Sequence, residues 1–368
     1  MKIRDVELLQ YRWERARPIR NGMHTYSHSG LSLVRIETDD GHCGLGWAGM
    51  PQTPGMAKVA QGLLEHFKPM LIGEDPFNYR RIWHSLWVPK LVGRRGLATR
   101  FISGIDIALW DLMGKATGKS AHKLLGGFRD RVPAYIAGGY YEAGKGLAGL
   151  AAEMEANLEL GAKAVKMKIG GAPIKEDVER VRVARETIGA DVKLMVDANC
   201  AYSLREAIQI AGRMEPYDVF WFEEPLAPDD YRGHGILARS TSIPIATGEN
   251  EYTRYGFRDL IAHDAAAIYN ADAQVLGGIT EFMNVAALAA AHELHIAPHG
   301  DQELHLHLVG AISNGLIVEF YRETVDANRG RIFEEKMTLD EDGCLTVPDL
   351  PGLGVTPNYD FLKKYRIQ

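Results

Sequence analysis

The chain has 368 residues, of which 46% are hydrophobic and 24% are charged, and its formal net charge is −6. This length supports one large domain with a smaller one beside it. The charge balance gives no electrostatic case for nucleic-acid binding, and no apolar stretch is long enough to span a bilayer. Three widely spaced cysteines form no disulfide framework and the N-terminus lacks the apolar core of a signal peptide, so we expect a cytoplasmic protein.

The first part of the chain predicts strands followed by helices. Apolar and polar residues alternate loosely over 6–11 and more cleanly over 31–38, where Asp39–Gly41 provides a hairpin turn into a return strand at 43–47. The polar, His-bearing stretch Pro18–Gly30 predicts a long loop, a length typical of lids and binding loops. Helical periodicity follows around residues 55–70, 77–88 and 99–116.

From Val132 onward the pattern changes to alternating strands and helices. A first strand is predicted at Val132–Gly139, and helical periods occur in stretches such as 175–188, 203–214 and 259–265. Short apolar runs without alternation suit strands that are buried on both faces. Seven such runs each end in a side chain that can bind metal or move a proton: Lys168, Asp197, Glu223, Glu249, Asp272, His299 and Glu319. The repeat length matches a parallel βα barrel, whose C-terminal strand ends form the active-site face.

Three of these side chains predict a metal site. Asp197, Glu223 and Glu249 are 26 residues apart, and three carboxylates suit a hard octahedral cation such as Mg²⁺, with Mn²⁺ as a substitute. No competing Cys/His set indicates zinc. The alternative is that each carboxylate only caps the helix that follows it. Equal spacing on successive strands favours one metal ion per subunit.

Two lysines predict an acid–base group. Lys166 and Lys168 alternate across Met167, so both point to the same side of a strand. A second cation nearby and burial both lower a lysine pKa, so Lys168 is expected to serve as a general base near neutral pH. The alternative is a pair of solvated surface lysines.

A second acid–base group is predicted on the opposite side of the barrel. His299 ends the seventh strand, and Asp272, at the end of the sixth, could orient its ring. The alternative for a lone histidine is a structural residue of the core whose hydrogen bonds are satisfied there. Glu319 on the eighth strand could donate a proton or hydrogen bond to a substrate carboxylate if its pKa is raised, and its alternative is a structural acid buried with a basic partner.

Weaker signals lie outside these strand ends. Asn21, His24 and Tyr26 could reach the substrate from the predicted loop, although an ordinary surface loop explains them equally well. A cluster of polar residues follows His299 and could merely mark an exposed helix start; its members are Asp301, Glu303, His305 and His307.

At these residues the chain resembles the mandelate racemase subgroup of the enolase superfamily. The matching motifs are Lys166-x-Lys168, Val196–Asn199, Glu223–Pro225, Gly248–Asn250, Asp272 with Gly277–Thr280, His299, Ser103–Asp111 and Leu124–Gly127. The resemblance implies an α/β fold, a (β/α)7β modified TIM barrel with an N-terminal α+β capping domain. We place the capping domain at 1–125, the barrel at 126–329, and a tail at 330–368 that packs back onto the first domain.

The resemblance also implies a chemistry. It gives one essential Mg²⁺ on Asp197, Glu223 and Glu249, with Lys168 and the His299–Asp272 pair as acid–base groups. It places Lys166 at the developing enediolate, Glu319 near the substrate carboxylate, and Asn199 among the candidate substrate contacts. The expected substrate is a small hydroxy-carboxylate, and the expected assembly is a homo-oligomer.

Segments of the chain resemble one activity within this subgroup, the D-tartrate dehydratases. These are Pro18–Asn21, Ala137–Tyr141 and Lys166–Pro173, whereas Gly300–His305 departs by carrying two acids. We therefore expect a dehydratase of a sugar acid, with tartrate as one candidate. The alternatives are a racemase, epimerase or cycloisomerase that uses the same Lys/His pair, and a non-catalytic carboxylate-binding protein, because fold alone does not choose the reaction.

Overall fold

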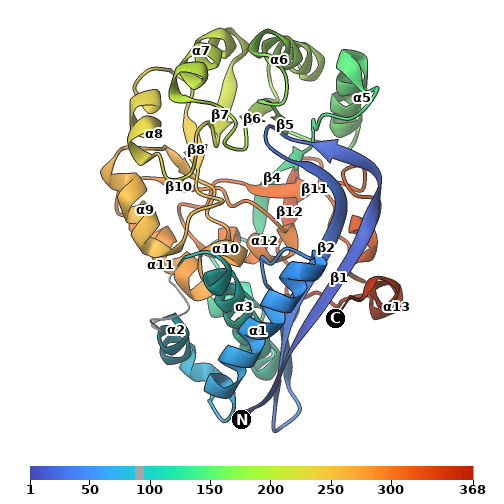
Figure 1. Ribbon diagram of the computed structural model, residues 1–368, viewed down its shortest axis with the longest axis vertical. Helices are drawn as coiled ribbons and strands as arrows, with labels where there is room; N and C mark the ends of the chain where they lie inside the picture. The colour runs from blue at the N-terminus through green and yellow to red at the C-terminus, as the bar shows by residue number, and fades with distance from the viewer. Residues whose placement is uncertain (88–94, 368) are drawn as a thin grey trace.

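The computed structural model describes residues 1–87 and 95–367, which form two sheets (Figure 1). A three-stranded antiparallel sheet contains β1 (Ile3–Arg20), β2 (Thr25–Thr38) and β3 (Cys43–Trp47). The second sheet is a parallel barrel to which one further strand is added. None of the helices in these two ranges has the length and apolar character needed to cross a bilayer.

The antiparallel sheet confirms the predicted meander, and three helices pack against it. They are α1 (Pro54–Leu71), α2 (Tyr79–Trp87) and α3 (Leu97–Thr117), preceded by the short turn η1 (Pro76–Asn78). Inward-facing strand residues such as Val6, Val34 and Ile36 form one apolar core with these helices. The predicted helices lie within a few residues of the observed ones; Val88, where the second was expected to end, lies outside the described residues.

The predicted loop at Pro18–Gly30 is wrong. The two strands continue through it as a long hairpin, in which Ile19 pairs with Tyr26 and Arg20 with Thr25. The Arg20 and Tyr141 main chains exchange two hydrogen bonds of 2.9 Å, so the hairpin reaches the barrel (Figure 1). An exposed arm buries neither face fully, so its residues carry no hydrophobic alternation that would reveal a strand.

Eight parallel strands build the barrel in the order β10-β9-β8-β7-β6-β5-β4-β11. A parallel bridge between Ile296 and Gly315 links its two ends. Their bounds are β4 (Arg131–Ala137), β5 (Ala164–Lys168), β6 (Lys193–Asp197), β7 (Val219–Glu223), β8 (Ile245–Thr247), β9 (Ile268–Tyr269), β10 (His295–Ile296) and β11 (Val318–Tyr321). The predicted fold class is confirmed.

Helices surround the barrel strands (Figure 1). They are α5 (Gly146–Glu159), α6 (Ile174–Ile188), α7 (Leu204–Met214), α8 (Tyr231–Ala238), α9 (Thr253–Ala262), α10 (Ala273–Leu276), α11 (Gly278–Ala290) and α12 (Gln302–Ala311); α4 (Ala121–Leu124) precedes the barrel. The helix predicted at 259–265 in fact begins at Thr253. Its first turns carry Arg254, Tyr255 and Arg258 on the outside, which obscured the apolar periodicity.

Alternation along β5 decides which side chains enter the barrel. Val165 and Met167 pack outward in the core shared with the helices. Lys166 and Lys168 therefore point inward, where the apolar filling includes Tyr135 and Trp221. This confirms the prediction that both lysines share one side.

The C-terminal tail contacts both parts of the molecule. Its strand β12 (Cys344–Thr346) pairs antiparallel with β4, and α13 (Tyr359–Leu362) follows. The Phe333 ring lies 5.4 Å from the Trp47 ring, and the Tyr365 ring lies 5.8 Å from that of Trp13. These contacts agree with a tail that packs back, while the domain limits stay a prediction.

The capping sheet approaches α3 so closely that a glycine is needed at the contact. A Cβ on Gly46 would lie 2.0 Å from the carbonyl oxygen of Gly104, whereas a Cβ on Gly62 of α1 meets nothing within 4 Å. We expect Gly46→Ala to lower the free energy of unfolding by about 1–3 kcal/mol through overpacking. The control Gly62→Ala should raise it by about 0.5–1 kcal/mol, because alanine loses less conformational freedom in a helix. Urea unfolding measures both, and equal stability of the two variants would contradict the close packing.

Candidate active site

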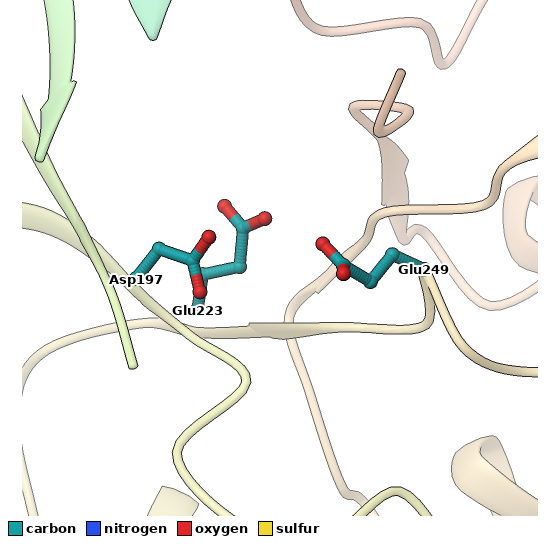
Figure 2. A group of neighbouring side chains, drawn as sticks. All are labelled: Asp197, Glu223 and Glu249. Atoms are coloured by element: carbon teal, nitrogen blue, oxygen red, sulfur yellow. The ribbon is translucent and has the colours of Figure 1, made fainter. Parts of the chain in front are cut away.

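Three carboxylates converge at the C-terminal end of the barrel. Asp197 ends β6, Glu223 ends β7 in register with it, and Glu249 follows β8 by two residues. Each offers an oxygen, and these oxygens all lie within 4.8 Å of one another. Figure 2 shows Asp197 and Glu223 side by side, with the Glu249 side chain reaching toward them from across a gap.

The donor set fits a hard divalent cation. All three ligands are carboxylate oxygens, the type that Mg²⁺ prefers. The Glu249 Oε2 atom is buried and has no hydrogen-bond partner among the described residues, which is unfavourable unless a positive charge meets it there. The geometry therefore agrees with the predicted ligand set.

Lys166 is buried at the centre of a cluster of acids. Its Nζ lies 2.8 Å from Glu223, 3.0 Å from Glu319 and 3.8 Å from Asp197, and it donates to the Tyr135 hydroxyl at 3.2 Å. Burial lowers the pKa of Lys166, but the carboxylates outweigh this and raise it well above its usual value. This direction favours a charged Lys166, which donates hydrogen bonds to both oxygens of Glu223.

Lys168 contacts Asp197 directly and lies over the Tyr140 ring, with its Nζ 5.2 Å from the ring centroid. The predicted lowering of its pKa is wrong for this arrangement. Burial and Lys166 do lower the pKa of Lys168, but the negative charge of Asp197 outweighs them and raises it. The prediction considered only the two lysines of β5 and did not include the effect of Asp197, which pairs with Lys168 from the neighbouring strand β6.

His299 and Asp272 form the predicted pair. The His299 Nδ1 lies 3.0 Å from Asp272 Oδ2, and its Nε2 lies 3.8 Å from Glu249 Oε2. Burial lowers the pKa of His299, but Glu249 and Asp272 outweigh it and raise the pKa well above its usual value. Lys168 thus contacts one carboxylate of the triad, Asp197, and His299 lies near another, Glu249.

The condition set for Glu319 as a donor, a raised pKa, is not met, and the acid is buried with the basic partner Lys166 at 3.0 Å, as the alternative expected. Burial raises the pKa of Glu319, but Lys166, His299 and Lys168 outweigh it and lower the pKa to about 2. Its Oε2 also accepts a hydrogen bond of 2.9 Å from the Gly300 backbone. Glu319 therefore acts as a hydrogen-bond acceptor in this state rather than as a proton donor.

A cavity of about 520 Å³ opens beside these residues, and Tyr26, Tyr140, Glu249, Asp272 and His299 contribute to its lining. Tyr26 comes from the hairpin arm, so this arm forms part of the cavity wall.

The other candidate substrate contacts differ in their positions. Asn21 is buried and donates to the Tyr26 hydroxyl at 3.0 Å. His24 is exposed and does not line the cavity. Asn199 donates its backbone N–H to Asp197 at 2.8 Å, and its side-chain oxygen is buried without a partner among the described residues.

Sequence reasoning missed two tyrosines at this site. Tyr135 accepts a hydrogen bond from Lys166, and the ring of Tyr140 faces Lys168. Tyr135 lies in the first barrel strand, β4, and Tyr140 lies in the segment that follows its last residue, Ala137. The position of Tyr140 at a strand end, the criterion used for the other seven strands, would have identified it.

Of the two acids after His299, Glu303 is buried and Asp301 is half-buried, so they do not mark an exposed helix start. Arg329 contacts both Asp301 and Glu303 and donates to the Gln302 side chain at 3.0 Å. This arginine comes from the segment after β11, 26 residues or more away. The two acids by which Gly300–His305 departs from the D-tartrate dehydratase pattern are therefore paired with Arg329. The spacing of residues in the sequence did not indicate this arginine.

Comparison with known proteins agrees with this geometry. The family model described as "Enolase C-terminal domain-like" matches residues 149–361, and that of the "Mandelate racemase / muconate lactonizing enzyme, N-terminal domain" matches residues 3–126. The chain belongs to the enolase superfamily, in its mandelate racemase subgroup. It is therefore an enzyme, and its relatives support a lyase activity while an isomerase activity also fits.

Several named relatives cover nearly the whole chain. The arabinonate dehydratase of Saccharolobus solfataricus is 37% identical over 91% of this chain and 90% of its own length. The 3,6-anhydro-alpha-L-galactonate cycloisomerase of Streptomyces coelicolor is 36% identical over 92% of this chain and 91% of its own. The L-talarate dehydratase structure from Polaromonas sp. JS666, complexed with Mg and L-glucarate, superposes with a TM-score of 0.90 at 34% identity, covering 100% of this chain and 98% of that one.

We expect Glu249→Gln to weaken Mg²⁺ binding by more than the roughly 10–100-fold that loss of an outer-shell partner costs, because it removes a direct ligand. Isothermal titration calorimetry measures the affinity without substrate. Glu251→Gln is the matched control: Glu251 is a buried glutamate two residues away, but it accepts from Tyr231 at 2.5 Å instead of joining the triad. Equal Mg²⁺ affinity in both variants would contradict the assigned ligand set.

Proposed function

We propose that this enzyme is a Mg²⁺-dependent dehydratase of a sugar acid. The observation that carries the proposal is the placement of Lys168 and His299 beside two different carboxylates of the triad, Asp197 and Glu249. Such a site can remove a proton from one face of a bound hydroxy acid and deliver a proton on the other. Named dehydratases of arabinonate and of L-talarate/galactarate among the relatives support this reaction class.

The site is suited to stabilising an enediolate. A proton beside a carboxylate is very weakly acidic, so its removal requires positive charge where the new negative charge develops. A Mg²⁺ ion on Asp197, Glu223 and Glu249 would supply that charge. The Lys166 ammonium, which lies within 4 Å of Asp197 and Glu223, adds to it.

Lys168 is the proposed base. In its neutral form its Nζ takes the α-proton, and the electrons of the broken C–H bond form the enediolate. The charge of Asp197 raises the pKa of Lys168, and a cation bound by that carboxylate would offset this charge.

His299 is the proposed acid. It gives its proton to the departing β-hydroxyl, the C–O bond breaks as the enediolate collapses to an enol, and water leaves. Asp272 holds the ring through Nδ1, which keeps Nε2 free to face the cavity. The enol then ketonises to a 2-keto-3-deoxy acid.

A second reaction class uses the same two groups. One base on each face also suits racemisation or epimerisation by two-base exchange, and a cycloisomerase is among the relatives. Tartrate remains one candidate substrate on the basis of the resembling segments. Mn²⁺ as a substitute metal, a homo-oligomeric assembly and a cytoplasmic location stay predictions.

We expect incubation with Mg²⁺ and a panel of aldonic and aldaric acids to yield a 2-keto acid from at least one of them, detected as its semicarbazone. Chelation of the metal should abolish this product, since the enediolate would lose its main stabilising charge. NMR of the same mixtures detects epimerised or cyclised products. A product of that kind without any keto acid would replace the dehydratase proposal with the isomerase alternative.

A further inference from the structure

A second imidazole lies against Asp272, on the side away from His299. His305 belongs to α12 and its side chain is completely buried. Its Nε2 lies 3.3 Å from Asp272 Oδ1, while His299 contacts the other oxygen of the same carboxylate. Asp272 is therefore enclosed by two histidines, only one of which lines the cavity.

The polar contacts of His305 identify its tautomer. Its Nδ1 lies 3.1 Å from the backbone oxygen of Asp301, which can only accept, so Nδ1 carries the proton. Its Nε2 is then an acceptor, and it receives the backbone N–H of Ala273 at 3.1 Å. His305 thus connects the start of α12 with the residue that directly follows Asp272.

This connection fixes the turn that carries Asp272. Asp272 caps α10, and its Oδ1 accepts the backbone N–H of Gln274 at 2.7 Å. The first two N–H groups of α10, those of Ala273 and Gln274, are therefore satisfied by His305 and Asp272. With Oδ1 occupied in this way, Oδ2 is left to face His299.

The other end of the connection is also anchored. The Asp301 carbonyl that receives His305 belongs to the residue whose carboxylate contacts Arg329. Although burial raises it, the hydrogen bond from His299 holds the pKa of Asp272 well below its usual range. The carboxylate facing His299 is therefore ionised and held by groups on both sides.

We propose that His305 is a positioning residue for the His299–Asp272 pair: through its hydrogen bond to Ala273 it fixes the Asp272 carboxylate, and thereby the orientation of the His299 ring. The inference rests on the proposed acid–base role of His299. Without an acceptor at Nε2, the buried Ala273 N–H is left unpaired, and the turn must shift to find another partner.

Three variants test the proposal. His305→Phe keeps an aromatic ring of similar size but removes both hydrogen bonds. His305→Gln restores an acceptor near the Nε2 position. His307→Phe is the matched control, because His307 lies on the same helix, is equally buried and bonds the Leu353 carbonyl at 3.0 Å, remote from Asp272.

We expect His305→Phe to lower kcat about 10–100-fold, the range for loss of an orienting partner, with KM nearly unchanged. His305→Gln should recover most of this loss. His307→Phe should destabilise the fold to a similar extent, because it also leaves a buried polar group unpaired, but should leave kcat near the wild-type value. Equal kcat values for the two phenylalanine variants would overturn the proposal.

A spectroscopic readout separates this proposal from the proposed function. In protein labelled with ¹⁵N-histidine, the Nδ1–H proton of His299 is assigned by its loss in His299→Asn. We expect this resonance in the wild type, His305→Gln and His307→Phe, and its loss or broadening in His305→Phe. A resonance unchanged in His305→Phe overturns the positioning role. The expected loss of this resonance, in a protein that dehydrates no sugar acid, supports that role and rejects the dehydratase activity.

If His305→Phe does not fold, His305→Asn, which keeps only a donor near Nδ1, takes its place.

Discussion

The structure depends most on the burial of Lys166 among three carboxylates inside the barrel. An ion removed from water costs several kcal/mol unless partners compensate it, and removing one partner of such a group leaves an uncompensated charge. Lys166 donates hydrogen bonds to Glu223, forms an ion pair with Glu319 and lies within 4 Å of Asp197. This ammonium group therefore holds together two of the three candidate metal ligands and the acid on the last strand. Because the carboxylates outnumber the lysines at this end of the barrel, the site keeps a surplus of negative charge for a divalent cation.

The remaining parts of the fold surround this charged centre and place other polar side chains around it. Lys168 meets the triad at Asp197, and His299 meets it at Glu249. The hairpin of β1 and β2 brings Tyr26 into the cavity wall, and the segment after β11 brings Arg329 to the residues that follow His299. The cavity that His299 lines is thus walled by segments from both ends of the chain.

Much of this site could be predicted from the sequence, because barrel strands place their last residues at one face. That rule located Asp197, Glu223, Glu249, Lys168 and His299 without any knowledge of contacts. It could not give the pKa of Lys168 or Glu319, since each depends on charges contributed by other strands. The hairpin at Pro18–Gly30 lacked alternation because neither face is fully buried, and Arg329 reaches Asp301 from a segment with no strand-end signal. His305 looked like part of an exposed helix start because its partner, Ala273, lies 32 residues earlier.

The most direct test of this account is exchange of the substrate α-proton in D₂O, measured by NMR together with keto-acid formation. With Lys168 as base and His299 as acid, His299→Asn should retain α-proton exchange while dehydration stops, and Lys168→Ala should lose both. Each loss should exceed the roughly 10²–10⁴-fold contribution of a single acid–base group, because the two halves of the reaction depend on each other. Exchange that survives in Lys168→Ala but disappears in His299→Asn would reverse the two roles. Near-wild-type dehydration in both variants would contradict the account as a whole.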